Sequence, residues 1–197
     1  KLMLGVYHPT EGTVTIGRQS LQKISFKEWR KHCGVVMQEG FIFGDTIANN
    51  IVPDGNMIDK KRLLYAVEMA NIRDFVESLP LKYNTKIGNT GQGLSQGQKQ
   101  RILIARAIYR NPDYLFFDEA TNALDTDNEK VIQGNLEKFF KDKTVVIVAH
   151  RLSTVKNADQ IVVLKEGEIT EKGTHDELIT RQGDYYRLVK NQLELSA

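Results

Sequence analysis

Three short apolar runs in the second half of the chain restrict its fold most strongly. Residues 114–117, 144–149 and 160–164 are rich in apolar side chains and show no regular alternation of apolar and polar positions. Runs of this kind are typical of strands in a parallel sheet covered by helices on both faces. Residues 127–140 have a helical pattern and lie between the first two runs, as a crossover between parallel strands requires. The sequence therefore predicts an α/β fold.

The stretch from residue 45 to residue 110 is helical in character instead. Within 59–70, apolar side chains recur three and four residues apart, at Leu63, Leu64, Val67 and Ala70. Ser95 and Gln98 have the spacing of a capping box, which predicts a helix over 95–109. We expect a core made of residues 1–44 and 111–197, with a helical subdomain, residues 45–110, inserted between its two parts.

The remaining elements are shorter. Ser25 and Glu28 have the same capping-box spacing and predict a helix over 25–32. A polar strand over 168–172 is expected to form an edge hairpin through a turn at Glu166 and Gly167. Further strands are expected at 13–17 and 34–38, and further helices at 74–78, 174–181 and 184–193.

Composition excludes several classes of protein. The 27 Lys and Arg residues nearly balance 25 Asp and Glu residues, and the two signs are interspersed, so a strongly basic nucleic-acid surface is not expected. The longest strictly apolar run, 145–149, is far shorter than the ~20 residues that cross a bilayer. The single cysteine, Cys33, rules out an internal disulfide framework and suits a reducing compartment. Residue 1 is not Met, so we expect the chain to be a piece of a longer protein.

Two acids follow the first apolar run directly. Asp118 and Glu119 would lie at the carboxyl end of a parallel sheet, where folds of this kind bind ligands. Asp118 could hold Mg²⁺, and Glu119 could then polarise a water molecule. Taken alone, a strand followed by two acids is more often a solvated strand end.

Three other polar positions stand at the ends of predicted elements. Ser95 and Gly97 open a helix, where backbone N–H groups attract anions, although a plain N-cap with no ligand is the better reading of them alone. Gln38 ends a strand and could bind Mg²⁺ or orient a water molecule. His150 follows the strand 144–149 and could reach a γ-phosphate, but a structural histidine is the better reading of it alone. His8, His32 and His175 have no ligand spacing, and we interpret them as structural.

The order of these positions resembles the nucleotide-binding domain of ATP-binding cassette (ABC) transporters along essentially the whole chain. Gln38 matches the Q-loop, and Leu94-Ser95-Gln96-Gly97-Gln98 matches the signature motif. Residues 114–119 match the Walker B strand and catalytic glutamate, residues 120–125 match the D-loop that ends at Asp125, and His150 matches the switch histidine. The resemblance implies a P-loop NTPase (RecA-like) core with a mostly parallel sheet.

Further segments are similar to the exporter type of ABC transporter. Phe41-Ile42-Phe43 after the Q-loop, residues 173–178 and Tyr185-Tyr186 carry this likeness. Within the exporters, residues 79–85 and 116–125 resemble the peptide or bacteriocin exporters that contain a peptidase domain.

The resemblance implies a head-to-tail dimer of two such domains with two ATP molecules between them. Gln38 and Asp118 would hold Mg²⁺, Glu119 would orient or deprotonate the attacking water, and His150 would contact the γ-phosphate. Four residues would act on the ATP of the partner domain: Ser95, Gly97, Gln98 and Asp125. The further partners would be transmembrane domains of the same transporter, docked near residues 38–51. The location would be the cytoplasmic face of the inner (plasma) membrane, and nucleic acid is not an expected partner.

Two features depart from the family pattern. Gln96 stands where the signature usually has a first Gly, although Gly97 still allows close approach of a phosphate. No phosphate-cradling G-x-x-x-x-G-K-S/T occurs in the 197 residues. We therefore expect this chain alone to bind ATP very weakly and hydrolyse it negligibly. We also expect a neighbour, an exchanged segment or a rearrangement to complete its sheet.

Two other functions remain open at this point. The missing loop favours a non-catalytic fragment or interaction module. An ABC-type ATPase of DNA repair or translation would need a coiled-coil insertion or a strongly basic face, and neither is visible.

Overall fold

The computed structural model describes residues 1–38, 40–52, 57–88, 91, 93–119, 126–149 and 155–194. Side-chain positions are not described for residues 126–127 and 192–194. The chain divides into two compact units, Lys1–Val146 and Ile147–Ala197. The gaps contain two of the predicted site residues, Asp125 and His150.

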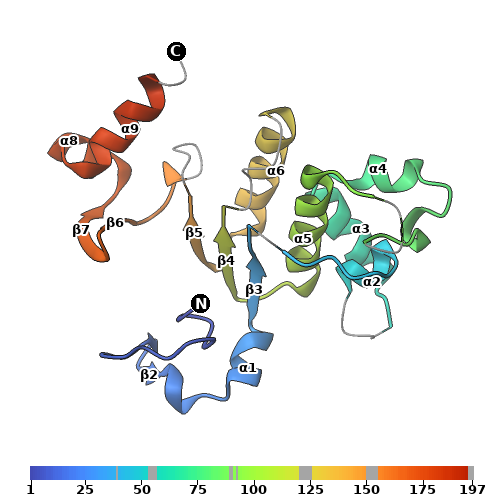
Figure 1. The fold of residues 1–197 in the computed structure, drawn as a ribbon, viewed down its shortest axis with the longest axis horizontal. Coiled ribbons are helices and arrows are strands. Elements are labelled where there is room, and N and C mark those ends of the chain that lie inside the picture. The colour runs from blue at the N-terminus through green and yellow to red at the C-terminus, as the bar shows by residue number, and fades with distance from the viewer. Residues whose placement is uncertain are drawn as a thin grey trace. The chain divides into compact units, whose positions relative to one another are not determined.

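The strands that carry the predicted site belong to a three-stranded sheet with the order β3-β4-β5. Its strands are β3 (Cys33–Val36), β4 (Tyr114–Asp118) and β5 (Thr144–Val148), drawn side by side in Figure 1. Strands β3 and β4 run parallel, and the crossover helix α6 (Thr126–Phe139) follows β4 along the chain. Because Leu115 and Phe117 of β4 are buried, the apolar run at 114–117 anchors the sheet as predicted.

The predicted helical stretch forms a set of short helices before the long helix α5 (Gln96–Arg110), shown in cyan to green in Figure 1. The shorter ones are α2 (Ile47–Ile51), α3 (Lys60–Met69), α4 (Arg73–Ser78) and the 3₁₀ turn η2 (Lys82–Asn84). Ile102, Ala105 and Ile108 of α5 are buried, as their spacing predicts. On α3 the prediction is wrong for Leu64, which is 42% exposed while Leu63 and Val67 are buried.

The N-terminal segment is held by contacts with one short helix. Residues 1–6 form a turn, followed by β1 (Thr15–Ile16), β2 (Gln19–Ser20), the 3₁₀ turn η1 (Leu21–Lys23) and α1 (Phe26–Lys31). Trp29 Nε1 donates to the Met3 carbonyl at 2.9 Å. The capping box predicted at Ser25 does not form, because Glu28 bonds to Lys31 at 2.8 Å instead of reaching back.

The second unit contains an antiparallel hairpin packed on two helices. Strands β6 (Ile161–Lys165) and β7 (Glu168–Gly173) precede α8 (His175–Arg181) and α9 (Asp184–Glu194). Ile161 and Val163 are buried against Leu178, Tyr185 and Val189.

The prediction that residues 160–164 form a strand of a parallel sheet buried on both faces is wrong for the described residues. The two-residue turn at Glu166 and Gly167 returns the chain at once, so β6 pairs antiparallel with β7. One face of β6 is left open, with Val162 at 43% and Leu164 at 69% exposure. Within the described ranges, no helix is both long and apolar enough to cross a bilayer.

Candidate functional site

Strand register brings the first two candidate residues to the same edge of the sheet. Val36 of β3 lies opposite Phe117 of β4 in a parallel pair. Gln38 follows two residues after Val36, and Asp118 directly follows Phe117. Both side chains therefore lie at the carboxyl edge, where α/β sheets bind ligands. Gln38 is exposed and Asp118 is half-buried, so both are open to a ligand from solvent.

The backbone turns sharply immediately after Asp118. Glu119 has a φ of 49°, in the left-handed region that is uncommon for any residue except glycine. Backbone strain of this kind gathers at functional sites, where the surrounding structure holds it in place. The turn ends β4, and the half-buried Glu119 directly follows the metal-binding candidate Asp118 in the chain.

The donors at this edge fit Mg²⁺ bound together with a phosphate. Gln38 supplies an amide oxygen and Asp118 a carboxylate, which are hard oxygen ligands. Among the residues described, no cluster of three or more His, Cys, Asp or Glu side chains could hold a metal by itself. Mg²⁺ commonly binds through one or two protein ligands and completes its shell with water and phosphate oxygens. The pair Gln38 and Asp118 suits that mode.

The start of α5 forms the second part of the candidate site. The predicted capping box is present: the Gln98 amide donates to Ser95 Oγ at 3.2 Å, and the Ser95 amide donates to Gln98 Oε1 at 2.9 Å. The cap uses the Gln98 amide, so the first-turn N–H groups of Gln96 and Gly97 are the donors left for an anion. The Ser95 hydroxyl also keeps its proton as a donor while its oxygen caps the helix.

The remaining predicted site residues cannot be placed. Asp125 and His150 lie outside the described residues, and so do the other residues of the segment 120–125. Their roles stay predictions.

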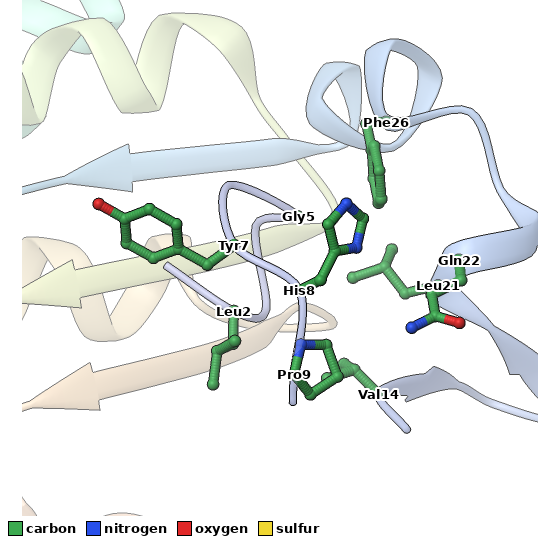
Figure 2. A pocket seen from close by; sticks show the side chains of 9 residues that line it. All are labelled: Leu2, Gly5, Tyr7, His8, Pro9, Val14, Leu21, Gln22 and Phe26. Carbon is green, nitrogen blue, oxygen red and sulfur yellow. The ribbon is translucent and has the colours of Figure 1, made fainter. Parts of the chain in front are cut away.

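Two surface depressions formed by described residues do not match a nucleotide site. One is lined by Leu2, Gly5, Tyr7, His8, Pro9, Val14, Leu21, Gln22 and Phe26 (Figure 2). Its volume of about 10 Å³ is near the minimum for one water molecule. The other, of about 340 Å³, is lined by Glu68, Asn71, Arg73, Asp74 and Glu77. Three acids against one arginine disfavour an anionic ligand there.

Sequence reasoning missed two polar residues that bond to each other, one on α2 and one on α5. Asn50 is fully buried, and the Arg106 guanidinium on α5 bonds to its carbonyl at 2.6 Å. The one available signal was that Arg106 comes four residues after Ile102, beside the apolar face of the helix. That spacing gives no indication of a partner 56 residues away.

Comparison with known proteins agrees with this geometry. The sequence profile of the family described as ABC transporter matches residues 1–122. The chain is 45% identical over 192 residues to ATP-binding cassette sub-family B member 5 of Mus musculus, covering 98% of this chain and 15% of that protein. It is 44% identical over 189 residues to Multidrug resistance protein 3 of Entamoeba histolytica, covering 94% of this chain and 14% of that protein. It thus spans about one-seventh of these relatives' length.

A solved structure shows the same fold. The structure of a bacterial Atm1-family ABC exporter with ATP bound superposes with a TM-score of 0.93 at 36% identity, covering 98% of this chain and 34% of that one. This confirms the prediction of an α/β P-loop NTPase fold with a parallel sheet. By its sequence and its fold, the chain belongs to the ABC transporter family and has the fold of that family's ATPase domain.

Proposed function

We propose that the chain is part of the ATP-hydrolysing domain of an ABC exporter and couples ATP hydrolysis to transport across a membrane. The observation that carries the proposal is the parallel register of β3 and β4, which sets Gln38 and Asp118 at one edge of the sheet. The capped start of α5 adds an anion-binding helix end. The relatives' names, an exporter and a multidrug resistance protein, support the transport part.

In the proposed reaction, ATP and water give ADP and inorganic phosphate. Gln38 and Asp118 hold Mg²⁺, which neutralises charge on the phosphates and orients them. Glu119 orients the attacking water and accepts its proton as the bond between the terminal phosphorus and the bridging oxygen breaks. The proposed role of His150 is a contact to the γ-phosphate.

In this proposal the start of α5 binds a second ATP, which is held by a partner domain. The Ser95 hydroxyl and the Gly97 amide donate to phosphate oxygens of ATP held by a partner domain, and Gln98 steadies Ser95 through the capping box. Asp125 would act across the same interface. A second copy of the domain is therefore the proposed partner at this face.

The proposed transmembrane partner docks on residues 38–51, which join the metal site to the helical subdomain 45–110. Residues 1–44 and 111–197, outside the helical subdomain, form the ATPase core in this proposal. Such a domain would lie at the cytoplasmic face of the plasma membrane. The finer assignment to peptidase-containing peptide exporters depends on residues 79–85 and 116–125 alone.

The sequence contains no phosphate-cradling glycine-rich loop with its lysine. We propose that these 197 residues alone bind ATP very weakly and do not hydrolyse it at a measurable rate. The same observation favours a second candidate, a non-catalytic interaction module. Calorimetry with ATP and Mg²⁺ on the isolated chain tests the binding, and micromolar affinity would contradict the proposed weak binding of ATP.

Substitution of the proposed base separates the two candidates. In the intact ATPase that contains this chain, Glu119→Gln should lower kcat by about 10²–10⁴-fold, the usual contribution of a general base, while ATP binding persists. Glu11→Gln is the matched control, because Glu11 is an exposed acid remote from the site in sequence. Unchanged turnover in Glu119→Gln would remove Glu119 from its proposed role.

A further inference from the structure

The segment from Phe41 to Asn50, here called the aromatic loop, presents two aromatic rings to solvent. Phe41 is 68% exposed and Phe43 45% exposed. Their rings pack edge to face with centroids 5.1 Å apart. Exposed aromatic side chains this close to a candidate site need a support that fixes their direction, because an unsupported loop would sample many conformations.

Arg106 of α5 supplies that support through the planar fork of its guanidinium. Its Nε donates to the Asn50 carbonyl at 2.6 Å, its Nη1 to the Phe41 carbonyl at 3.0 Å, and its Nη2 to Asn50 Oδ1 at 3.3 Å. The guanidinium also lies over the Phe43 ring, 5.2 Å from its centroid. One side chain thus contacts both ends of the aromatic loop and one of its two exposed rings.

The Asn50 side chain binds the backbone of the aromatic loop. It is fully buried and accepts from the Phe43 amide at 2.8 Å. Its Nδ2 donates to the carbonyls of Phe43 and Thr46, each at 3.0 Å. Because the same Oδ1 also accepts from Arg106, the loop closure and the contact with α5 form one hydrogen-bonded network.

The loop is also fixed on its other sides. The Ile87 amide donates to the Asp45 carbonyl at 2.9 Å, and the Ile47 amide donates to the Thr85 carbonyl at 3.0 Å. At the start of the segment, a Cβ on Gly40 would overlap the Leu103 side chain of α5, so the backbone approaches that helix as closely as glycine allows.

A purely stabilising role explains the arrangement poorly. Burial lowers the pKa of the Arg106 guanidinium, which nevertheless stays protonated because arginine titrates far above neutral pH. The oxygens that it contacts within the described residues are carbonyl and amide oxygens, which carry no full charge. Burying a cation against neutral acceptors is costly, and an apolar side chain would fill the space at lower cost.

We propose that Arg106 is a positioning residue that fixes the aromatic loop on α5, so that Phe41, Phe43 and the start of α5 move as one rigid element. Its fork binds two carbonyls and an amide oxygen at once, which the single ammonium of lysine cannot reproduce. The consequence for activity rests on the proposed function: a partner that presses on Phe41 and Phe43 would displace Ser95 and Gly97 with them.

Amide hydrogen exchange on the chain tests the restraint directly. In Arg106→Lys the Phe43 amide should exchange at least tenfold faster than in the wild type, while the Leu178 amide of the second unit is unchanged. Arg62→Lys is the matched control, because Arg62 lies over the Tyr109 ring at 5.0 Å and bridges α3 to α5 away from the loop. Phe43 exchange within twofold of the wild type in Arg106→Lys would overturn the proposal.

A second measurement needs no variant and covers the case in which Arg106→Lys fails to fold. In the wild-type chain, the Arg106 Nε–H should be visible by NMR at neutral pH and should show a coupling across its hydrogen bond to the Asn50 carbonyl. An Nε–H that exchanges as fast as that of exposed Arg62 would overturn the proposal.

Turnover in the intact ATPase distinguishes the restraint of the loop by Arg106 from the effect of that restraint on ATP hydrolysis. Arg106→Lys should lower kcat about tenfold and leave KM for ATP within twofold, because Arg106 touches the loop and not the nucleotide. Faster Phe43 exchange with unchanged kcat would refute the link from the loop to α5. If the wild-type protein itself hydrolyses no ATP, the proposed function fails while the exchange data still decide the role of Arg106.

Discussion

Ser95 offers a way to separate helix capping from anion binding at one atom. Its hydroxyl oxygen caps α5, and the same hydroxyl is a proposed donor to phosphate. Asp and Asn cap helices about as well as Ser, so Ser95→Asp and Ser95→Asn should change the free energy of unfolding by less than about 0.5 kcal/mol. Ser95→Ala removes the cap and should cost about 1 kcal/mol.

The effect on the nucleotide should differ sharply between the two capped variants. A carboxylate about 4 Å from a phosphate charge is repelled by about 4 kcal/mol at an effective dielectric of 20, which is roughly a thousandfold in affinity. Screening by salt reduces this repulsion, so at least a tenfold loss of ATP turnover is expected for Ser95→Asp. Ser95→Asn lacks the charge and should lose far less.

The assay pairs urea unfolding of the chain with phosphate release by the intact ATPase. Thr174→Ala is the stability control, because Thr174 and Glu177 form the same capping box on α8 in the second unit. That variant should also cost about 1 kcal/mol but should leave turnover unchanged. A folded Ser95→Asp protein that hydrolyses ATP as fast as the wild type would refute the proposed anion contact.

Three further predictions concern the stability of the fold. Burial raises the pKa of the Cys33 thiol from 9.0 to about 11, so the contribution of this thiol to stability is complete below pH 9 and is lost between pH 9 and 11. The free energy of unfolding in urea should therefore fall by roughly 2 kcal/mol across that range in the wild type but not in Cys33→Ala. Equal slopes against pH in the two proteins would contradict this prediction. Asn50→Leu removes the side-chain partner of the Phe43 amide, of the Phe43 carbonyl and of Arg106 Nη2, and should cost at least about 3 kcal/mol in urea unfolding, whereas a cost below about 1 kcal/mol would show that the network relaxes. Leu115→Ala opens a cavity in the middle of β4 and should cost about 2–5 kcal/mol, and a neutral result would place Leu115 outside the core.

Local signals predicted the elements well where the partners are close in sequence. The capping box of Ser95 and Gln98 formed as its spacing predicts, because both residues lie in one turn. The identical spacing at Ser25 and Glu28 failed because Lys31, one turn further on, takes the Glu28 carboxylate. At Ser25 the motif therefore failed because its acid found another partner, which the spacing alone does not reveal.

Contacts between distant segments lay beyond the sequence pattern. The apolar run of β6 predicted a buried parallel strand, but the tight turn after Lys165 produced a hairpin with one open face. The bond between Arg106 and Asn50 joins residues 56 positions apart, and each alone looks like an ordinary polar side chain. That Gln38 and Asp118 lie at one edge of the sheet could be predicted, because parallel strands end at a common edge, which is a property of the fold class.

In the proposed function, Gln38 and Asp118 together hold the Mg²⁺ of bound ATP. The most direct test is the Mg²⁺ concentration that gives half-maximal phosphate release by the intact ATPase, measured for the wild type, Gln38→Leu and Asp118→Asn. Each variant should need at least tenfold more Mg²⁺, with the larger shift in Asp118→Asn because it removes a full charge. An unchanged Mg²⁺ requirement in both variants, with turnover retained, would contradict the account.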